Sequence, residues 1–377
     1  MPRFEIRRVL ILGASGQFGR RLCRRLARQD GLHLLLAGRD RQKLQATQKI
    51  LGSTAKTDVV PCDIGSGLLE SLHSRRPDAV IHLAGPFQAQ DYGVARACLQ
   101  ARVPYMDMAD GREFVAQFSS LDAAAREKGI PLITGASTVP GLSAAIIDAT
   151  LREFSQLQAI DYGISAALQS GLGAATLRAV LSYCGKPYEI LEDGKRTTVY
   201  GLGRPRYHDF PTPLNRRFIV DCDIPDHCLF PARYPSLRQM NFGSCIDFPG
   251  LPQLLSAMSD CVRSGWIANW NFLSGFVELF MSGIKSFPFG SSDSGFFMRL
   301  EGLDQHANSK KSLLEILARD GSGLEIPITP VVLLIKKMLK GESLPAGAYP
   351  CMGLFSLAEL MEELSSYPTS WDWKHMQ

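Results

Sequence analysis

A glycine-rich loop near the N-terminus limits the possible folds of this chain more than any other feature. The apolar run 9–12 predicts a buried strand, and residues 17–28 predict a helix that follows it directly. In the G-x-x-G-x-x-G loop between them, the first glycine permits a sharp turn, the second lets the backbone approach a diphosphate, and the third allows close helix–strand contact. We expect ligand contacts from the loop and the helix start, where N–H groups would face phosphates: Gly13, Ala14, Ser15, Gly16, Gln17, Phe18 and Gly19. A glycine turn without a ligand is the alternative.

Short apolar runs alternate with helical stretches over the first 140 residues. Strands are expected at 9–12, 32–37, 57–62, 79–83, 103–106 and 130–134, and helices at 17–28, 41–51, 92–101 and 113–128. Such alternation is typical of parallel strands joined by right-handed crossovers. The predicted fold class is α/β, with an N-terminal Rossmann doubly wound parallel sheet that binds ligands beyond the carboxyl ends of its strands.

The end of the second predicted strand selects the nucleotide. Arg39 stands twenty positions after Gly19, where NAD-binding chains place an acid for the ribose 2′-hydroxyl. A guanidinium suits a 2′-phosphate, so NADP is favoured over NAD, although Asp40 would still accept an unphosphorylated ribose. Asp63 follows the third strand and either borders the adenine pocket or caps a helix.

Two further groups follow the fourth and fifth strands. Gly85-Pro86-Phe87 would shape the pocket of the nicotinamide end, or would be a simple turn. Tyr105, Asp107 and Asp110 are the candidate catalytic residues, because a carboxylate there can orient an amine or relay a proton. The alternative is that Asp107 caps a helix and Tyr105 packs.

Other candidates carry less weight. His82 is expected to be a core histidine rather than a catalytic one, and Thr138, Pro140 and Gly141 are candidates for cofactor or substrate contact. The chain has no Tyr-x-x-x-Lys pair of short-chain dehydrogenases and no Gly-x-Ser-x-Gly elbow of hydrolases. Cys222, His227 and Cys228 lack the spacing of a zinc site, so no metal is expected.

Five segments together resemble a known family. The Gly13–Gly19 loop, Gly38-Arg39-Asp40, Gly85-Pro86-Phe87, Tyr105-x-Asp107-x-x-Asp110 and Pro140-Gly141-Leu142 occur in this order. This set resembles the saccharopine dehydrogenase-like NADP-binding oxidoreductases, over about residues 8–150. The resemblance implies a Rossmann domain completed by C-terminal helices, with a second α+β domain inserted. It leaves the substrate open, because the family is functionally mixed.

The predicted domains are 1–150, the dinucleotide-binding domain; 151–327, a substrate or dimerisation domain; and 328–377, C-terminal helices that return to the first domain. In the second, strands are expected at 158–166, 188–191, 196–200, 295–303 and 312–317, whereas 201–252 shows no clear pattern. In the third, Thr329-Pro330 predicts a helix start and 356–364 a last helix.

Composition and charge indicate which ligands, partners and cellular location to expect. Residues 1–150 carry 20 Lys and Arg against 14 Asp and Glu, whereas the remainder has 21 against 23, so an anionic ligand is expected on the N-terminal half. The basic cluster Arg20, Arg21, Arg24, Arg25 and Arg28 is expected to be solvated, and no aromatic interleaving supports nucleic-acid binding. Nine scattered cysteines and no signal peptide favour a cytoplasmic protein. The apolar segment from Trp266 to Ile284 is expected to form a buried or interface helix, with weak membrane-surface contact as the alternative.

These features predict an NADP-dependent oxidoreductase. Hydride would pass between the nicotinamide and a small carbonyl, imine or amino-acid-like substrate in an interdomain cleft. The alternative is a non-catalytic NADP-binding sensor or scaffold, suggested by the missing acid–base pair, and possibly membrane-associated. A homodimer is expected by analogy with other inserted sheets.

Overall fold

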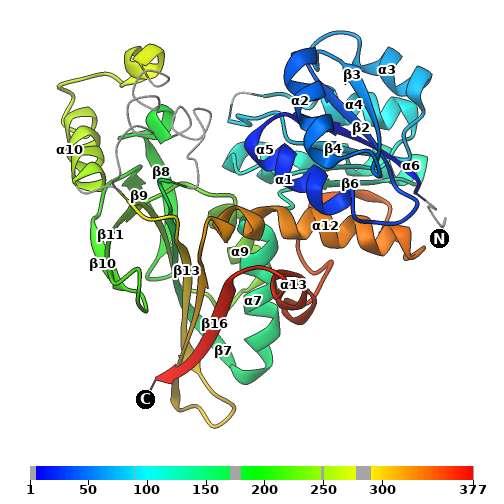
Figure 1. The fold of residues 1–377 in the computed structure, drawn as a ribbon. Coiled ribbons are helices and arrows are strands. Elements are labelled where there is room, and N and C mark those ends of the chain that lie inside the picture. The colour runs from blue at the N-terminus through cyan, green and yellow to red at the C-terminus, as the bar shows by residue number, and fades with distance from the viewer. Residues whose placement is uncertain (1–5, 89, 170–179, 248–249, 277–289, 377) are drawn as a thin grey trace. The chain divides into compact units, whose positions relative to one another are not determined.

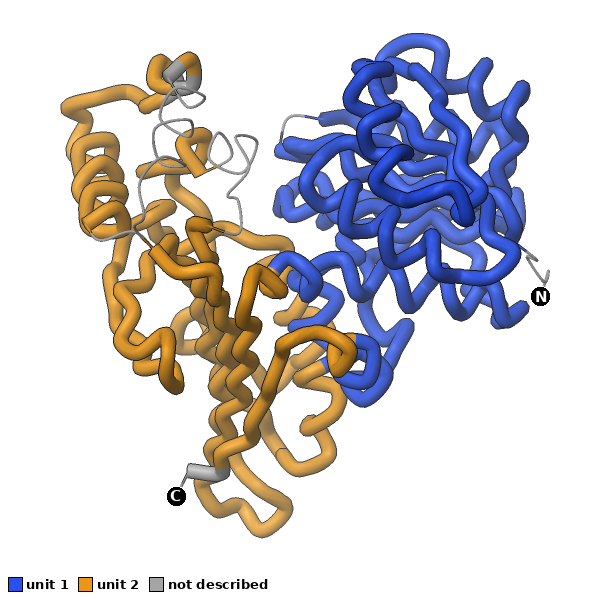
Figure 2. The backbone as a smooth tube through the Cα atoms, in the orientation of Figure 1, with its two compact units in different colours: residues 1–145, 324–363 blue, residues 146–323, 364–377 orange. Residues whose placement is uncertain are grey.

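The computed structural model describes residues 6–88, 90–169, 180–247, 250–276 and 290–376. The chain divides into two compact units (Figure 2). The first comprises residues 1–145 and 324–363, and the second comprises residues 146–323 and 364–377. Each unit has its own seven-stranded sheet.

The first unit confirms the predicted Rossmann sheet. Its order is β15-β6-β5-β4-β1-β2-β3 and every pairing is parallel. The apolar strand β1 pairs with β2 on one side and with β4 on the other, so the strand order reverses between β1 and β4 and the switch point lies directly after β1. The strands are β1 (Arg8–Leu12), β2 (His33–Gly38), β3 (Lys56–Pro61), β4 (Ala79–His82), β5 (Tyr105–Asp107), β6 (Pro131–Thr134) and β15 (Gly347–Pro350).

Helices cover both faces of this sheet (Figure 1). On one side α1 neighbours α2 and α12, and on the other α4 neighbours α3 and α6. Leu22 and Leu26 of α1 are fully buried, as the predicted apolar stripe requires, and Phe18 is half-buried. The helices are α1 (Gln17–Leu26), α2 (Arg41–Leu51), α3 (Leu68–Arg75), α4 (Gly93–Ala101), α5 (Arg112–Ala116), α6 (Asp122–Lys128), α12 (Glu325–Leu339) and α13 (Leu357–Leu364).

One residue of the basic cluster is not solvated, against expectation. Arg25 is buried, and its guanidinium bonds Thr329 Oγ1 at 2.8 Å and Glu363 Oε1 at 2.8 Å. Arg21 also reaches the C-terminal part, with Glu325 Oε1 at 3.0 Å. These ion pairs attach α1 to α12 and α13, which explains how the C-terminal helices complete the first unit.

Three predicted elements of the first unit need correction. The single helix expected at 113–128 is broken into α5, a 3₁₀ turn at Phe118–Leu121, and α6. Helix α12 starts at Glu325, so Pro330 lies inside it and Thr329 is no cap; the Thr329 hydroxyl donates to Glu325 O at 2.8 Å. The strand β15 was not expected, because four residues between loops show no readable alternation.

The second unit contains a mixed sheet of order β10-β11-β12-β7-β13-β14-β16. Only β12 and β7 are parallel neighbours. The expected strands at 158–166, 295–303 and 312–317 are confirmed, as is the hairpin β8–β9 around Asp193-Gly194. The strands are β7 (Gln156–Ala166), β8 (Pro187–Glu192), β9 (Lys195–Tyr200), β10 (Arg206–Asp209), β11 (Arg216–Asp221), β12 (Gln239–Ile246), β13 (Ser294–Leu303), β14 (Ser309–Ala318) and β16 (Thr369–Met376).

The last strand corrects the predicted third segment, because β16 pairs with β14 along Lys311–Ala318. Residues 364–377 therefore belong to the second unit and do not continue the C-terminal helices. A strand at a chain end that alternates Trp and polar residues can satisfy its backbone only by adding to an existing sheet edge.

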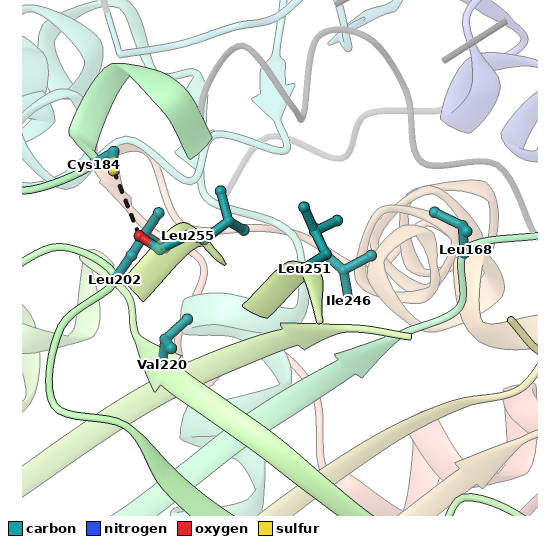
Figure 3. Packing of buried hydrophobic residues seen from close by; sticks show 7 residues of the cluster. All are labelled: Leu168, Cys184, Leu202, Val220, Ile246, Leu251 and Leu255. Carbon is teal, nitrogen blue, oxygen red and sulfur yellow. Dashed lines mark hydrogen bonds between the residues drawn. The ribbon is translucent and has the colours of Figure 1, made fainter. Parts of the chain in front are cut away.

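Three helices accompany this sheet: α7 (Ser143–Thr150), α9 (Asp226–Arg233) and α10 (Leu251–Arg263). The buried hydroxyl of Tyr162 on β7 donates to Asp226 Oδ2 of α9 at 2.6 Å. Helix α10 packs Leu251 and Leu255 into a cluster with Val220 of β11 and Ile246 of β12 (Figure 3). One face of the sheet is therefore covered by helices.

The segment from Trp266 to Ile284 does not form the expected buried helix over its described part. Trp266 is 81% exposed and residues Asn271–Phe276 form only a short 3₁₀ turn. Residues 277–284 lie outside the described part. Across the residues that the structure describes, no helix is long and apolar enough to cross a membrane.

Candidate cofactor and substrate site

The glycine loop packs so tightly that two of its positions require glycine. Gly13 has φ +83°, and a Cβ there would lie 3.0 Å from the backbone of Leu83 and Ala84 after β4. A Cβ on Gly19 would lie 2.2 Å from Gly13 O, so only glycine lets α1 pack against the turn. Both positions explain why the loop needs these residues.

The start of α1 adds a positive electrostatic end to this loop. Gly16 is the N-cap, has extended backbone angles and offers no side chain to satisfy the first helical N–H groups. The first N–H groups of any helix lack acceptors within the helix, and they attract anions together with the helix dipole. Gly13 N and Ala14 N instead donate to Ala37 O of β2, at 2.9 and 3.2 Å, and these bonds hold the turn against β2.

At the end of β2, the structure separates the roles of Arg39 and Asp40. Asp40 is the N-cap of α2, accepts from Lys43 N at 3.1 Å, and has its pKa lowered chiefly by this backbone hydrogen bond. Arg39 is exposed, and its guanidinium has no hydrogen-bond or ion-pair partner among the described residues. The acid is thus engaged in the helix cap, and the guanidinium remains available for an anion.

Asp63 does not cap a helix. Its carboxylate closes a tight turn by accepting from Gly65 N at 2.8 Å, and α3 begins later, after Gly67. The residue is exposed, and Cys62 N bonds Gly38 O at 3.0 Å, so Asp63 lies close to the end of β2. Its predicted place beside the adenine pocket stays a prediction.

The Gly85–Phe87 segment is more than a simple turn, because it is tied down at several points. The Gly85–Pro86 peptide bond is cis. Gln90 Nε2 donates to Ala84 O at 2.7 Å and to Pro86 O at 2.9 Å, and its Oε1 lies 3.0 Å from His82 Nε2. The Gln90 side-chain amide therefore holds the backbone of this segment in place. The sequence did not predict this role, because no motif marks it.

Phe87 and His82 form the apolar side of the same segment. Phe87 is 5% exposed and its ring meets the edge of the His82 ring at 5.0 Å. Burial lowers the pKa of His82 to about 4, so the imidazole is neutral at physiological pH. His82 is therefore the core histidine that the sequence suggested.

Tyr105 and Asp107 are brought together, but inside the unit. The Tyr105 hydroxyl donates to Asp107 Oδ2 at 2.8 Å, and Asp107 Oδ1 accepts from Ala109 N, Thr134 Oγ1 and Gly135 N at 2.8–2.9 Å. Both side chains are almost fully buried. Burial raises the pKa of Asp107 to about 6, against these four hydrogen bonds, which lower it. The carboxylate joins the loops after β5 and β6.

Asp110 differs from these two, because it is exposed. Its Oδ1 accepts from Gln88 Nε2 at 3.0 Å, which links it to the segment that follows β4. Of the three candidate catalytic residues, Asp110 is the exposed one, although burial of its carboxyl group raises the pKa of that group above its ordinary value.

The loop after β6 is compact and buried. Residues Thr138–Leu142 form a kinked turn in which Val139 has extended backbone angles, and the Val139–Pro140 peptide bond is cis. Thr138, Pro140 and Gly141 are all buried, so their expected contact with cofactor or substrate stays a prediction. Within the described ranges, no group of three or more His, Cys, Asp or Glu side chains could hold a metal ion.

The loops after β1, β2, β4, β5 and β6 therefore meet at the carboxyl edge of one parallel sheet. A glycine turn, an exposed helix N-terminus and an unpaired guanidinium at this edge define the class: a Rossmann dinucleotide-binding domain. The comparison with protein families agrees, since residues 9–133 match the saccharopine dehydrogenase NADP binding domain. This match identifies the region as a saccharopine dehydrogenase-like NADP-binding domain.

Solved structures extend the similarity of fold to the whole chain. Saccharopine dehydrogenase (L-Glu forming) from Saccharomyces cerevisiae is 16% identical, with a TM-score of 0.70, over 98% of this chain and 100% of that one. Amine dehydrogenase from Mycobacterium smegmatis is 11% identical, with a TM-score of 0.49, over 91% of this chain and 94% of that one. A search of the curated proteins finds no match.

Proposed function

We propose that the protein is an NADP-dependent oxidoreductase that moves hydride between the nicotinamide and a small carbonyl, imine or amino-acid-like substrate. The observation that carries the choice of NADP is the exposed, unpaired guanidinium of Arg39 beside an Asp40 that is engaged in a helix cap. A guanidinium binds a phosphate dianion through paired N–H donors.

The residues of the first unit have separate roles in this proposal. The N-terminus of α1 and the glycine loop bind the diphosphate, and Arg39 binds the 2′-phosphate. Gln90 holds the backbone of Ala84 and Pro86, so that the cis segment keeps one shape beside the nicotinamide. The cofactor supplies the hydride chemistry when it is bound.

Asp110 is the candidate that would touch substrate, because the residue is exposed and its carboxylate is oriented by Gln88. Tyr105 and Asp107 keep their predicted place near the reaction. Their burial and mutual hydrogen bond suit the holding of the β5 and β6 loops better than direct contact.

Calorimetry with NADPH and NADH tests the nucleotide part. Replacing Arg39→Ala should weaken NADPH binding by about tenfold or more, as expected for hydrogen bonds to a charged group, and leave NADH binding nearly unchanged. Lys49→Ala, an exposed cation at the far end of α2, is the matched control and should change neither. Equal NADPH binding in wild type and Arg39→Ala would refute the assignment.

The second candidate function is a non-catalytic NADP-binding sensor. It is favoured by the burial of Tyr105 and Asp107, which leaves Asp110 as the one exposed titratable group of the candidate trio. NADPH oxidation across a panel of keto acids and aldehydes with and without amines separates the two. Turnover that falls in Asp110→Asn supports the enzyme, whereas tight NADPH binding with no turnover supports the sensor.

We also propose that the protein is a homodimer of a reducing compartment, the cytoplasm. None of the nine cysteines forms a disulfide in the structure and seven of them are buried, as expected of a protein from a reducing compartment. Sedimentation of the full chain tests the dimer, and a single-species monomer at all concentrations would exclude it.

A further inference from the structure

The second sheet curls so strongly that strands far apart in its order approach each other. Strand β10 begins the sheet order and β14 stands near its other end, yet His208 Nε2 of β10 lies 2.9 Å from Glu315 Oε1 of β14. The His208 ring also stacks on Phe297 of β13, with 3.7 Å between ring centroids. The sheet is therefore a half barrel, and its concave face is the one opposite Tyr162 and the helices.

Apolar side chains fill one end of this concave face. The filled end consists of a buried cluster: Phe210, Leu214, Ile219, Cys245, Phe297, Leu313 and Leu317. Two residues further along β13, Arg299 points to the same face as Phe297 because strand side chains alternate. The polar remainder of the concave face therefore begins where the packed end stops.

At that other end the concave face contains a pocket of about 240 Å³. The register of the sheet explains why there is a depression here. Ala159 of β7 stands between Glu301 of β13 and Gln239 of β12. A methyl group between two long polar side chains leaves a depression. The next row is formed by Asp161, flanked by Arg299 and Asn241.

The charges around the pocket are balanced but loosely paired, and Glu301 also has a partner outside the lining, because Lys311 Nζ lies 3.5 Å from Glu301 Oε2. Arg206 Nη2 lies 3.3 Å from Asp161 Oδ1, and Arg299 Nη1 lies 3.4 Å from Asp161 Oδ2. These distances exceed the roughly 2.8 Å of a strong charge-assisted hydrogen bond. Arg206 binds Asp221 tightly through Nη1, at 2.5 Å, while its Nε and Nη2 are shielded and have no hydrogen-bond partner. Shielded guanidinium donors without partners are uncommon in folded proteins.

This charge pattern selects one kind of ligand. A simple anion would be repelled by Asp161 and Glu301, and a simple cation by Arg206 and Arg299. A molecule with both charges satisfies both pairs. The volume lies below the roughly 300–1,000 Å³ of pockets for drug-sized ligands, which leaves room for something of amino-acid size.

We propose that this pocket binds a small zwitterion of amino-acid size. Its carboxylate would face Arg299 and Arg206, and its ammonium group would face Glu301 and Asp161. Every lining residue belongs to the second sheet, so the site needs neither the glycine loop nor Arg39 and does not depend on the proposed function.

Calorimetry of the full chain without nucleotide tests the site, with L-glutamine, L-lysine and L-leucine as probes. At least one probe should bind with one-to-one stoichiometry. Its N-acetyl and carboxamide derivatives, which each lack one charge, should bind about tenfold more weakly or worse. The same loss is expected in Arg299→Gln and in Glu301→Gln.

Three controls keep the result interpretable. Arg216→Gln removes an exposed cation from the same unit, whose partner Asp209 is 3.9 Å away, and should bind like wild type. Arg39→Ala should also bind like wild type, which separates this site from the nucleotide site. Arg299→Lys keeps the charge and should show intermediate affinity, and thermal denaturation reports whether each variant is folded.

Three results would overturn the proposal. The first is that no zwitterionic probe binds. The second is that binding persists unchanged in folded Arg299→Gln and Glu301→Gln, which would place the probe elsewhere. The third is that these variants abolish self-association without any probe binding, which would make the pocket part of an interface between copies.

Discussion

Two carboxylates on strands, one in each unit, differ in how completely the protein satisfies them. Asp107 at the end of β5 is fully buried and accepts four hydrogen bonds of 2.8–2.9 Å. Asp161 on β7 has a side chain that is 25% exposed, and its guanidinium neighbours lie 3.3 and 3.4 Å away. The protein itself supplies close hydrogen-bond donors to the Asp107 carboxylate, whereas the Asp161 carboxylate has only long contacts with its guanidinium neighbours.

The difference follows from the two kinds of sheet. A parallel sheet is covered on both faces, so a polar side chain within it must be satisfied by the protein itself. The mixed sheet of the second unit has helices on one face and curls around the other, which leaves part of its concave face open to solvent. The proposed ligand sites therefore lie at the strand ends in the first unit and on the sheet face in the second.

The largest expected loss of stability follows from removing the buried carboxylate of Asp107. Asp107→Ala would leave four donors without an acceptor and should lower the free energy of unfolding by about 4 kcal/mol. Chemical denaturation of wild type and variant measures it. A loss below about 1 kcal/mol, the size usual for a surface charge, would contradict the role assigned to this residue.

The glycines of the first unit should separate folding from nucleotide binding. Gly19→Ala places a Cβ 2.2 Å from Gly13 O and should cost about 3 kcal/mol of stability as well as NADPH binding. Gly16→Ala is the matched variant, because its Cβ meets only Gly13 O, at 3.1 Å. It should retain stability and weaken NADPH binding, as measured by calorimetry. Unchanged binding in Gly16→Ala would mean that phosphates do not approach this turn.

The titration of Asp107 should make stability depend on pH. Its pKa rises from an ordinary 3.8 to about 6 on folding, so the folded state holds the proton more tightly than the unfolded state. The destabilisation is absent below pH about 4 and complete above about 6, where it amounts to about 2 to 3 kcal/mol. Asp107→Asn, which does not titrate, should show a flatter profile than wild type over this interval. Parallel profiles would show that Asp107 is not the responsible group.

The smallest change in stability should come from replacing the partly exposed Asp161. Asp161→Asn removes a charge whose pairs are long and partly solvated, and it should change stability by about 1 kcal/mol or less. Measured beside Asp107→Asn, it completes the comparison of the two units. A cost similar to that of the buried residue would show that Asp161 supports the fold rather than a ligand.

The fold of the first unit could be predicted from the sequence because the patterns that mark its strands and helices are local. Apolar runs of four to six residues that alternate with helical stretches predicted six of its seven strands and the Rossmann fold class. The glycine loop and Arg39 were also predicted from spacing alone. Three features were not predicted, because each depends on packing partners far away in the chain: the break in the 113–128 helix, the start of α12 and the short β15.

The second unit was less readable for the same reason. Strands β10, β11 and β12 lie in a segment rich in proline, glycine and aromatic residues, where no period of two is visible. The pocket joins residues of four strands, and nothing in the sequence places Arg206 beside Asp161. Gln90 was missed as well, since its role depends on two carbonyl groups of a cis segment.

By itself, the sequence predicted the fold class, the glycine turn with its expected phosphate contacts and the preference for NADP, because each depends on neighbouring residues and strand periodicity. Only the tertiary structure decided which acids are buried and which are open, and that Asp40 is a helix cap while Arg39 is unpaired. It also decided that the last strand joins the second sheet. Burial and pairing arise when distant segments meet, and the free energy of a charged group depends on those neighbours more than on its place in the chain.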